Sequence, residues 1–189
     1  TDAAALIEPE VGGTVSDVSI RLQPSKHSRL PSPEEIGETN VSLMRKDMTL
    51  YAQSDAPKDS VPILLKVKQL RGYRLSSAAT DAVQQAVVKR INDMGIGGVA
   101  VRLASPDTDE SGRATVNVVA GTITEVQAKG IDEEQPAPVS SEAIVRRSPV
   151  QAGGQEPALL AVEDVNDYLA RLNRFPGRSV TAAISAGEN

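Results

Sequence analysis

Two stretches of this chain repeat one another at a constant offset, and this repeat limits the folds that the chain can adopt. The first is residues 82–104, AVQQAVVKRINDMGIGGVAVRLA, and the second is residues 164–185, DVNDYLARLNRFPGRSVTAAIS. When the two are superposed without a gap, apolar positions fall on apolar positions and the turn glycine Gly95 falls on the turn proline Pro176. Each copy has the pattern of an amphipathic helix, an abrupt stop and an alternating strand. The sequence therefore predicts two tandem modules.

The first copy contains the clearest helix of the chain. Ser76 or Ser77 can cap its start, and because no helix breaker follows, the helix is predicted to run to about Met94. Gly95 is expected to end it in the left-handed conformation that stops many helices. The side chains expected to face the core are Val83, Val87, Ile91 and Met94. Those expected to face water are Gln84, Lys89 and Asp93.

Three strands are predicted around this helix. Apolar and polar side chains alternate over residues 62–70, which precede the helix, and over residues 99–103 and 115–119, which follow it. An acidic loop over residues 106–113 joins the last two strands. The order strand, helix, strand, strand predicts a compact α+β unit in which the helix packs on a small mixed sheet.

The second copy predicts a similar module that lacks its last strand. Residues 122–129 are expected to be its opening strand, and Ser140 or Ser141 is expected to cap a short helix that ends at Arg147. An amphipathic helix that begins near Val162 is expected to end at the turn over residues 175–177. Residues 180–184 then alternate as the closing strand.

Residues 1–60 are interpreted as an amino-terminal β extension. Residues 14–22 alternate as a half-buried strand, and Ser32 with Pro33 can start a single helical turn. The apolar runs at 41–44 and 48–52 predict a hairpin. The predicted domains are thus an extension over 1–60, a first module over 61–120 and a truncated second module over 121–189.

The composition excludes several classes of function. A net charge of −5, with 2% aromatic residues and no basic run longer than a pair, leaves no footprint for nucleic acid. No apolar stretch is long enough to cross a bilayer as a helix. Because the chain has no cysteine, disulfides and cysteine-based metal sites are impossible. The scarcity of aromatic residues also predicts cores built from Val, Ile, Leu and Ala.

Two segments that could suggest catalysis or phosphate binding have simpler explanations. His27 is the only histidine, and no companion residues are visible for a catalytic or metal site. Residues 95–98, Gly-Ile-Gly-Gly, follow the carboxyl end of a helix. Phosphate loops instead precede an amino end, where free N–H groups and the positive end of the dipole attract the anion. A helix cap that leads tightly into the next strand is therefore favoured here.

Two charged segments are likewise explained without a ligand. Asp107, Asp109 and Glu110 lack the glycine and the distal glutamate of a complete calcium loop, which favours a solvated hairpin tip. Arg146 and Arg147 could contact an anion or a partner, but they also complement the carboxyl end of a helix. We therefore expect no enzymatic activity, no cofactor and no metal.

Several motifs in a fixed order carry a resemblance to a known family. In the first module these are VPILLKVKQLRGYRLSSAATDAVQQAVVKRINDMGIGGVAVRLA (61–104) and TVNVVAGTITEVQAKG (115–130). In the second they are SPVQAGG (148–154) and LARLNRFPGRSVTAAISAGEN (169–189). Together the modules resemble POTRA domains, the polypeptide-transport-associated repeats ahead of outer-membrane β-barrels, and above all those of two-partner-secretion transporters.

The resemblance implies that edge strands bind an extended client through main-chain hydrogen bonds, which read little of the side-chain identity. The implied client-binding residues are Val99, Ala100, Val101, Arg102 and Leu103 in the first module, and Val180, Thr181, Ala182, Ala183 and Ile184 in the second. These edges could instead be solvated, covered or used for packing between modules.

The resemblance also implies partners and a location. The expected partner is an unfolded or extended secreted polypeptide, at the periplasmic face of a bacterial outer membrane. We expect the chain to be a fragment, with a covalently continuous β-barrel domain beyond Asn189 that makes the only membrane contact. The alternative is a structural ring or scaffold module of a secretin-like envelope complex, whose contacts are with identical neighbours.

Overall fold

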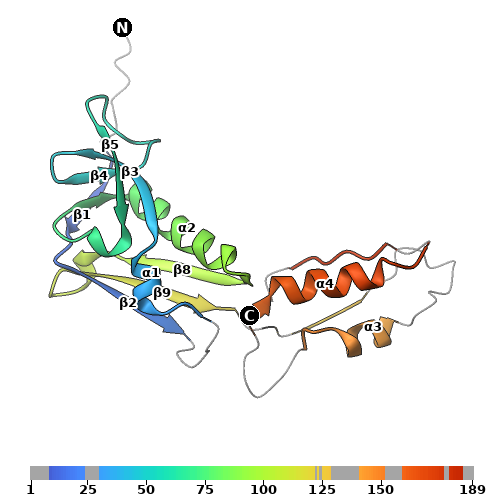
Figure 1. The fold of residues 1–189 in the computed structure, drawn as a ribbon. Helices are drawn as coiled ribbons and strands as arrows, with labels where there is room; N and C mark the ends of the chain where they lie inside the picture. Colours follow the sequence, from blue (N-terminus) through green and yellow to red (C-terminus); the bar gives the residue numbers. More distant parts are fainter. Residues whose placement is uncertain are drawn as a thin grey trace, which may run out of the picture. The chain divides into compact units, whose positions relative to one another are not determined.

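The computed structural model has an α+β fold (Figure 1). It describes residues 9–23, 30–121, 123, 125–128, 141–151, 159–176 and 179–184. The chain divides into two compact units. Unit 1 comprises Thr1–Met94 with Val99–Ala120, and unit 2 comprises Gly95–Gly98 with Gly121–Asn189.

Unit 1 contains a five-stranded sheet with the strand order β1-β6-β4-β3-β5. These strands are β1 (Val11–Thr14), β3 (Asn40–Lys46), β4 (Thr49–Tyr51), β5 (Val61–Lys66) and β6 (Arg74–Ser76). β3 and β4 pair in antiparallel fashion, which confirms the predicted hairpin. The tight turn between them places Asp47 at a φ of 52°, a conformation that Asp tolerates better than most residues.

Unit 1 also contains a three-stranded mixed sheet with the order β2-β9-β8. Its strands are β2 (Asp17–Gln23), β8 (Val99–Ala104) and β9 (Arg113–Ala120). β2 runs parallel to β9, whereas β8 runs antiparallel to β9. The strands predicted over 99–103 and 115–119 are therefore present and adjacent. The acidic loop between them contains a short 3₁₀ turn, η2 (Pro106–Thr108).

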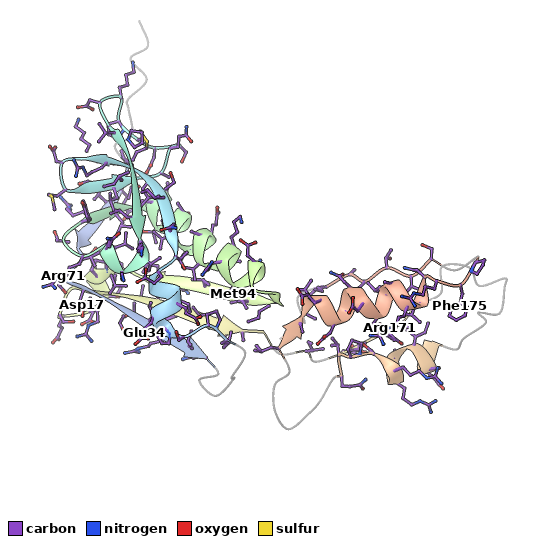
Figure 2. The ribbon with its side chains drawn as sticks, in the orientation of Figure 1. Asp17, Glu34, Arg71, Met94, Arg171 and Phe175 are labelled. Carbon is purple, nitrogen blue, oxygen red and sulfur yellow. The ribbon has the colours of Figure 1, made fainter. Side chains whose placement is uncertain are left out.

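Helix α2 (Ser77–Asp93) packs against both sheets, because it contacts β8 on one side and β3, β4 and β6 on the other (Figure 1). The Ser76 side chain accepts a hydrogen bond from the Ala79 N–H at 3.1 Å, which confirms the predicted cap. Val83, Val87 and Ile91 are fully buried, as predicted. Met94 is the exception, since it lies beyond the last turn and is 39% exposed (Figure 2).

Helix α1 (Pro33–Gly37) is the single helical turn that the sequence predicts. The Ser32 hydroxyl accepts a hydrogen bond from the Glu35 N–H, and the Glu35 carboxylate accepts one from the Ser32 N–H. This reciprocal capping box satisfies two amides that a helix amino end otherwise leaves unpaired. Glu34 and Glu35 also place negative charge in the first turn, where the helix dipole favours it. Glu34 lies on α1 (Figure 2).

The core of unit 1 is aliphatic, which confirms the prediction from the scarcity of aromatic residues. Apart from Ser76, its largest fully buried side chains are Val15, Ile36, Leu43, Leu50, Val67, Leu70, Val83, Val87, Ile91, Val116 and Val118. Each such side chain contributes roughly 1.5–3 kcal/mol of burial free energy. They come from both sheets and both helices, so unit 1 has one shared core.

The pairing of the strands corrects the predicted first module. The strand predicted over 62–70 ends at Lys66, because Val67–Gln69 (η1) turns into a 3₁₀ helix. This strand, β5, pairs with β3 and not with β8 or β9. The strand that joins β9 is β2, from the segment interpreted as an extension. Residues 9–23 and 30–60 therefore lie in the same compact unit as the predicted first module and do not form a separate extension.

The described residues of unit 2 form a two-stranded antiparallel ribbon and two helices. Its elements are β7 (Ile96–Gly97), α3 (Ser141–Arg147), β10 (Leu160–Ala161) and α4 (Val162–Leu172). α4 contacts α3, since the Tyr168 hydroxyl donates a hydrogen bond to the Ile144 carbonyl at 2.7 Å. Gly97 lies close to β10 and to the first residue of α4. A Cβ added to Gly97 would be 3.2 Å from Leu160 and 3.1 Å from Val162.

The second module differs from the prediction more than the first. Both of its predicted helices are present, but α4 has no buried side chain in the described part of the chain. The strand expected over 122–129 does not form at residues 123 and 125–128, and the rest of it lies outside the described residues. Unit 2 thus retains both predicted helices, whereas the predicted opening strand of this module does not form at the residues that are described.

Candidate functional site

The candidate site is the outer edge of β8, one of the two strands at which client binding is expected. In the described part of the chain, β9 is the only strand that pairs with β8, so β8 lies at one edge of the three-stranded sheet. β2 forms the opposite edge. An edge strand presents a row of backbone N–H and C=O groups on which another strand can add.

The hydrogen bonds show which β8 residues face outward. The Leu103 N–H donates to the Gln84 side-chain oxygen at 2.8 Å, so it points away from β9. Because outward and inward groups alternate along an antiparallel strand, Val99 and Val101 point the same way as Leu103. Ala100, Arg102 and Ala104 face their β9 partners instead. The Val99 and Val101 amides donate no hydrogen bond to any described residue.

Gln84 is a functional candidate that the sequence does not reveal. The periodicity of the helix places it on the water-facing side, but it is half-buried and reaches the β8 edge. Its amide nitrogen also donates to the Asp81 carboxylate at 3.1 Å, which helps to fix the side-chain orientation. Gln84 thus caps one end of the edge and leaves two outward positions open. No local signal identifies it, because its partner lies on another element.

The edges of the five-stranded sheet are capped more completely. On β5, Pro62 has no N–H, and the Lys66 N–H donates to the Gln69 side chain at 2.9 Å. Leu64 lies between these two residues, and its N–H also points outward. This N–H is the donor of the β5 edge that remains open. On β1, the Gly13 N–H donates to the Asp107 carboxylate at 3.0 and 3.1 Å. β8 therefore offers a longer open edge than β5.

The two faces of β8 differ in chemistry. The side chains of Val99, Val101 and Leu103 point toward α2, and Leu103 is buried. Those of Ala100, Arg102 and Ala104 point to the opposite face, where Ala100 and Arg102 are exposed. A strand added beside β8 would therefore meet an apolar face on one side and a polar face on the other.

The second expected edge does not form a strand. Residues 180–184 lie outside any strand or helix, and Ile184 is 73% exposed. The Asn173 side chain instead holds both backbone groups of Val180. Its oxygen accepts from the Val180 N–H at 2.6 Å, and its nitrogen donates to the Val180 carbonyl at 2.9 Å. Alternation alone did not produce a strand here, because these residues have no strand partner in the described part of unit 2.

The glycine-rich segment has the conformation of a helix cap. Gly95 has a φ of 85° and follows the end of α2, as predicted. Gly98 has a φ of 68°, so both positions favour glycine. The local geometry is that of a chain reversal after a helix carboxyl end, and it does not supply the amino-end amides that bind phosphate.

The acidic loop between β8 and β9 is occupied by hydrogen bonds of its own. The Asp107 carboxylate accepts from Gly13, and the Asp109 carboxylate accepts from the Ser111 N–H at 2.9 Å and hydroxyl at 2.7 Å. These two bonds from Ser111 lower the pKa of Asp109, and the charges of Arg113 and Arg21 add to the effect. The loop thus differs from a simple solvated tip, because Asp107 ties it to β1.

The remaining candidates give no further site. Arg146 and Arg147 occupy the last turn of α3, where they complement the helix dipole. His27 lies outside the described residues. Within the described ranges, no group of three or more His, Asp or Glu side chains could hold a metal ion. None of the described helices has both the length and the apolar character that crossing a membrane requires.

No protein-family model, no curated protein and no solved structure matches this chain. The function is therefore inferred from the geometry of the β8 edge and from the sequence pattern.

Proposed function

We propose that this chain is a POTRA-like module that binds an unfolded or extended polypeptide by adding it as a strand to the β8 edge. In this proposal the module acts on the periplasmic side of a bacterial outer membrane, as the accessory part of a β-barrel translocase in secretion or assembly. Its partner is the polypeptide in transit, and the chain carries out no chemical reaction on it.

The architecture of unit 1 supports the proposal. The resemblance implies a strand, a helical layer and two further strands, with the helices packed on a small mixed sheet. β2, α1 with α2, β8 and β9 follow in that order, and β2-β9-β8 is a mixed sheet. In the three-stranded sheet, β2 takes the position expected for the strand at 62–70. The five-stranded sheet is not part of the strand, helix, strand, strand pattern that the resemblance implies.

The single observation that carries the proposal is the pair of open backbone positions at Val99 and Val101. Their N–H groups point away from β9 and have no partner among the described residues. Each position can give one donor and one acceptor to an added strand. Because backbone groups are the same in every sequence, such an edge suits a receptor for unfolded chains of varied sequence.

A proline substitution tests the proposal directly. Val101→Pro removes an outward donor without removing a donor to β9, so the sheet itself should persist. The probe is a fluorescently labelled, reduced and carboxymethylated α-lactalbumin, which stays unfolded. We expect the full chain to bind it with an affinity that Val101→Pro weakens about tenfold, as loss of a hydrogen bond and a steric clash require.

The chain supplies a matched control on its other sheet. Leu64→Pro also removes an outward N–H from an edge strand, but on β5, and it should leave probe binding unchanged. Circular dichroism checks that each variant folds, and Val99→Pro serves if Val101→Pro does not. Unchanged probe binding by a folded Val101→Pro variant would exclude β8 as the binding edge.

A further inference from the structure

The face of the three-stranded sheet that points away from α2 has a row of polar side chains across all three strands. Arg21 on β2 lies beside Asn117 on β9, and Asn117 lies beside Arg102 on β8. Arg113 lies on the same face at the start of β9, in register with Asp17 of β2. Among the residues of β2, β8 and β9 on this face, Asp17 is the one acidic side chain against three arginines. This face is therefore basic, although the chain as a whole has a net charge of −5.

Arg102 is the member of this row at the open edge. Its side chain is exposed, and no hydrogen bond or ion pair joins its guanidinium to a described residue. Its neighbours on the same face of β8 are Ala100 and Ala104, which leave room for the side chains of an adjacent strand. Arg21 differs, because its charge acts on Asp109 in the loop between β8 and β9.

A strand added to β8 would have one side chain directly beside Arg102. The backbone of Arg102 hydrogen-bonds to β9, so Arg102 would form a non-hydrogen-bonded pair with an antiparallel added strand. In such pairs the opposite side chains approach most closely. The side chain of the added strand beside Val101 would instead lie on the face that α2 covers. Opposite charges stabilise such cross-strand pairs, and like charges weaken them.

We propose that Arg102 makes the β8 edge selective for extended segments that alternate apolar residues with acidic ones. The acidic side chain of the bound segment pairs with Arg102 on the basic face. The apolar side chain lies beside Val101 on the opposite, apolar face. This inference rests on the proposed function, since it names the class of polypeptide that the same edge prefers. Arg102 is thus a specificity residue, whereas the backbone of Val99 and Val101 supplies the binding itself.

Two synthetic peptides test the selectivity. One alternates valine with glutamate and the other alternates valine with lysine, so they differ only in the charge that faces Arg102. We expect the full chain to bind the glutamate peptide about threefold to tenfold more tightly, as a change from an attractive to a repulsive cross-strand pair requires. The preference should shrink as salt is added, because the pair is exposed.

A charge reversal and its control complete the experiment. Arg102→Glu should reverse the preference toward the lysine peptide. Arg45→Glu makes the same change on an exposed strand position of the other sheet and should leave the preference as it is. Equal binding of both peptides, still weakened by Val101→Pro, would overturn the selectivity and leave the proposed edge in place. Binding of neither peptide would overturn the selectivity, and it would overturn the proposed function as well if the unfolded α-lactalbumin probe also fails to bind.

Discussion

Single side chains that accept backbone N–H groups recur at the sheet edges of unit 1. Asp107 accepts from Gly13 at the β1 edge, Gln69 from Lys66 at the β5 edge, and Gln84 from Leu103 at the β8 edge. Unpaired edges invite association with other chains, and such contacts limit it. The β8 edge combines one of these caps with two open positions, so its binding capacity is restricted rather than abolished.

Removing the cap at Gln84 should change the exchange of one amide. Gln84→Ala leaves the Leu103 N–H without its acceptor, so hydrogen exchange of that amide should accelerate about twofold to tenfold, as the loss of one hydrogen bond requires. The neighbouring Gln85→Ala, at an exposed position of the same helix, is the control. The measurement is amide exchange by NMR, and equal Leu103 rates in both variants would contradict the assigned cap.

The contact between Gly13 and Asp107 gives a second prediction at this scale. A Cβ at Gly13 would lie 2.3 Å from an Asp107 oxygen, so Gly13→Ala should displace the carboxylate and lower the free energy of unfolding by about 1–3 kcal/mol. Gly12→Ala is the control, since its Cβ would find its nearest atom at 3.5 Å. Urea unfolding compares the two, and equal stability of both variants would contradict the role of this contact.

Local capping residues could be predicted from the sequence, whereas contacts between distant residues could not. Ser32, Ser76 and Gly95 act within a few residues of themselves, and their neighbours predict their roles. Asp107 and Gly13 are separated by 94 positions, and no pattern connects them. The same limitation applies to Gln84, whose partner depends on how α2 lies against β8.

At the scale of elements, periodicity predicted the existence of helices and strands better than their partners. The alternation at 62–70 correctly indicated a strand, but it contains no information that the strand pairs with β3. A similar alternation formed β8 at 99–104 and no strand at 180–184. The difference is that β9 pairs with β8, while residues 180–184 have no such partner in the described part of the chain.

The buried stripe of α2 gives a prediction at the scale of elements. Ile91→Ala should lower the free energy of unfolding by about 2–5 kcal/mol, because Ile91 is fully buried between the helix and the sheets. Met94→Ala, at the exposed end of the predicted stripe, should cost less than about 1 kcal/mol. Denaturant unfolding measures the free energy of unfolding of both variants. Equal losses in the two would mean that the buried stripe extends to Met94.

At the scale of the whole molecule, the two units differ in how much they bury. The shared aliphatic core lies in unit 1, and in the described part of unit 2 only Ile96 and Leu160 are buried hydrophobic residues. The repeat in the sequence correctly predicted a helix in each half but not this inequality. Residues 9–60 add strands to both sheets of unit 1, which a pattern confined to the repeat could not indicate.

The state of association separates the proposed function from its alternative. A module that binds a client at the β8 edge, with its β1 and β5 edges partly capped, should be a monomer across the concentrations that light scattering covers. A structural ring module would instead form a closed oligomer of defined size. A discrete ring that forms as the concentration rises would favour the self-association alternative over client binding.

Residue-resolved hydrogen exchange tests most directly whether an extended polypeptide adds to the outward backbone groups of β8. With the valine–glutamate peptide bound, the Val99 and Val101 amides should become protected, while Ala100 and Arg102, which face β9, should change little. Protection confined to β2, or to residues outside the three-stranded sheet, would contradict the account.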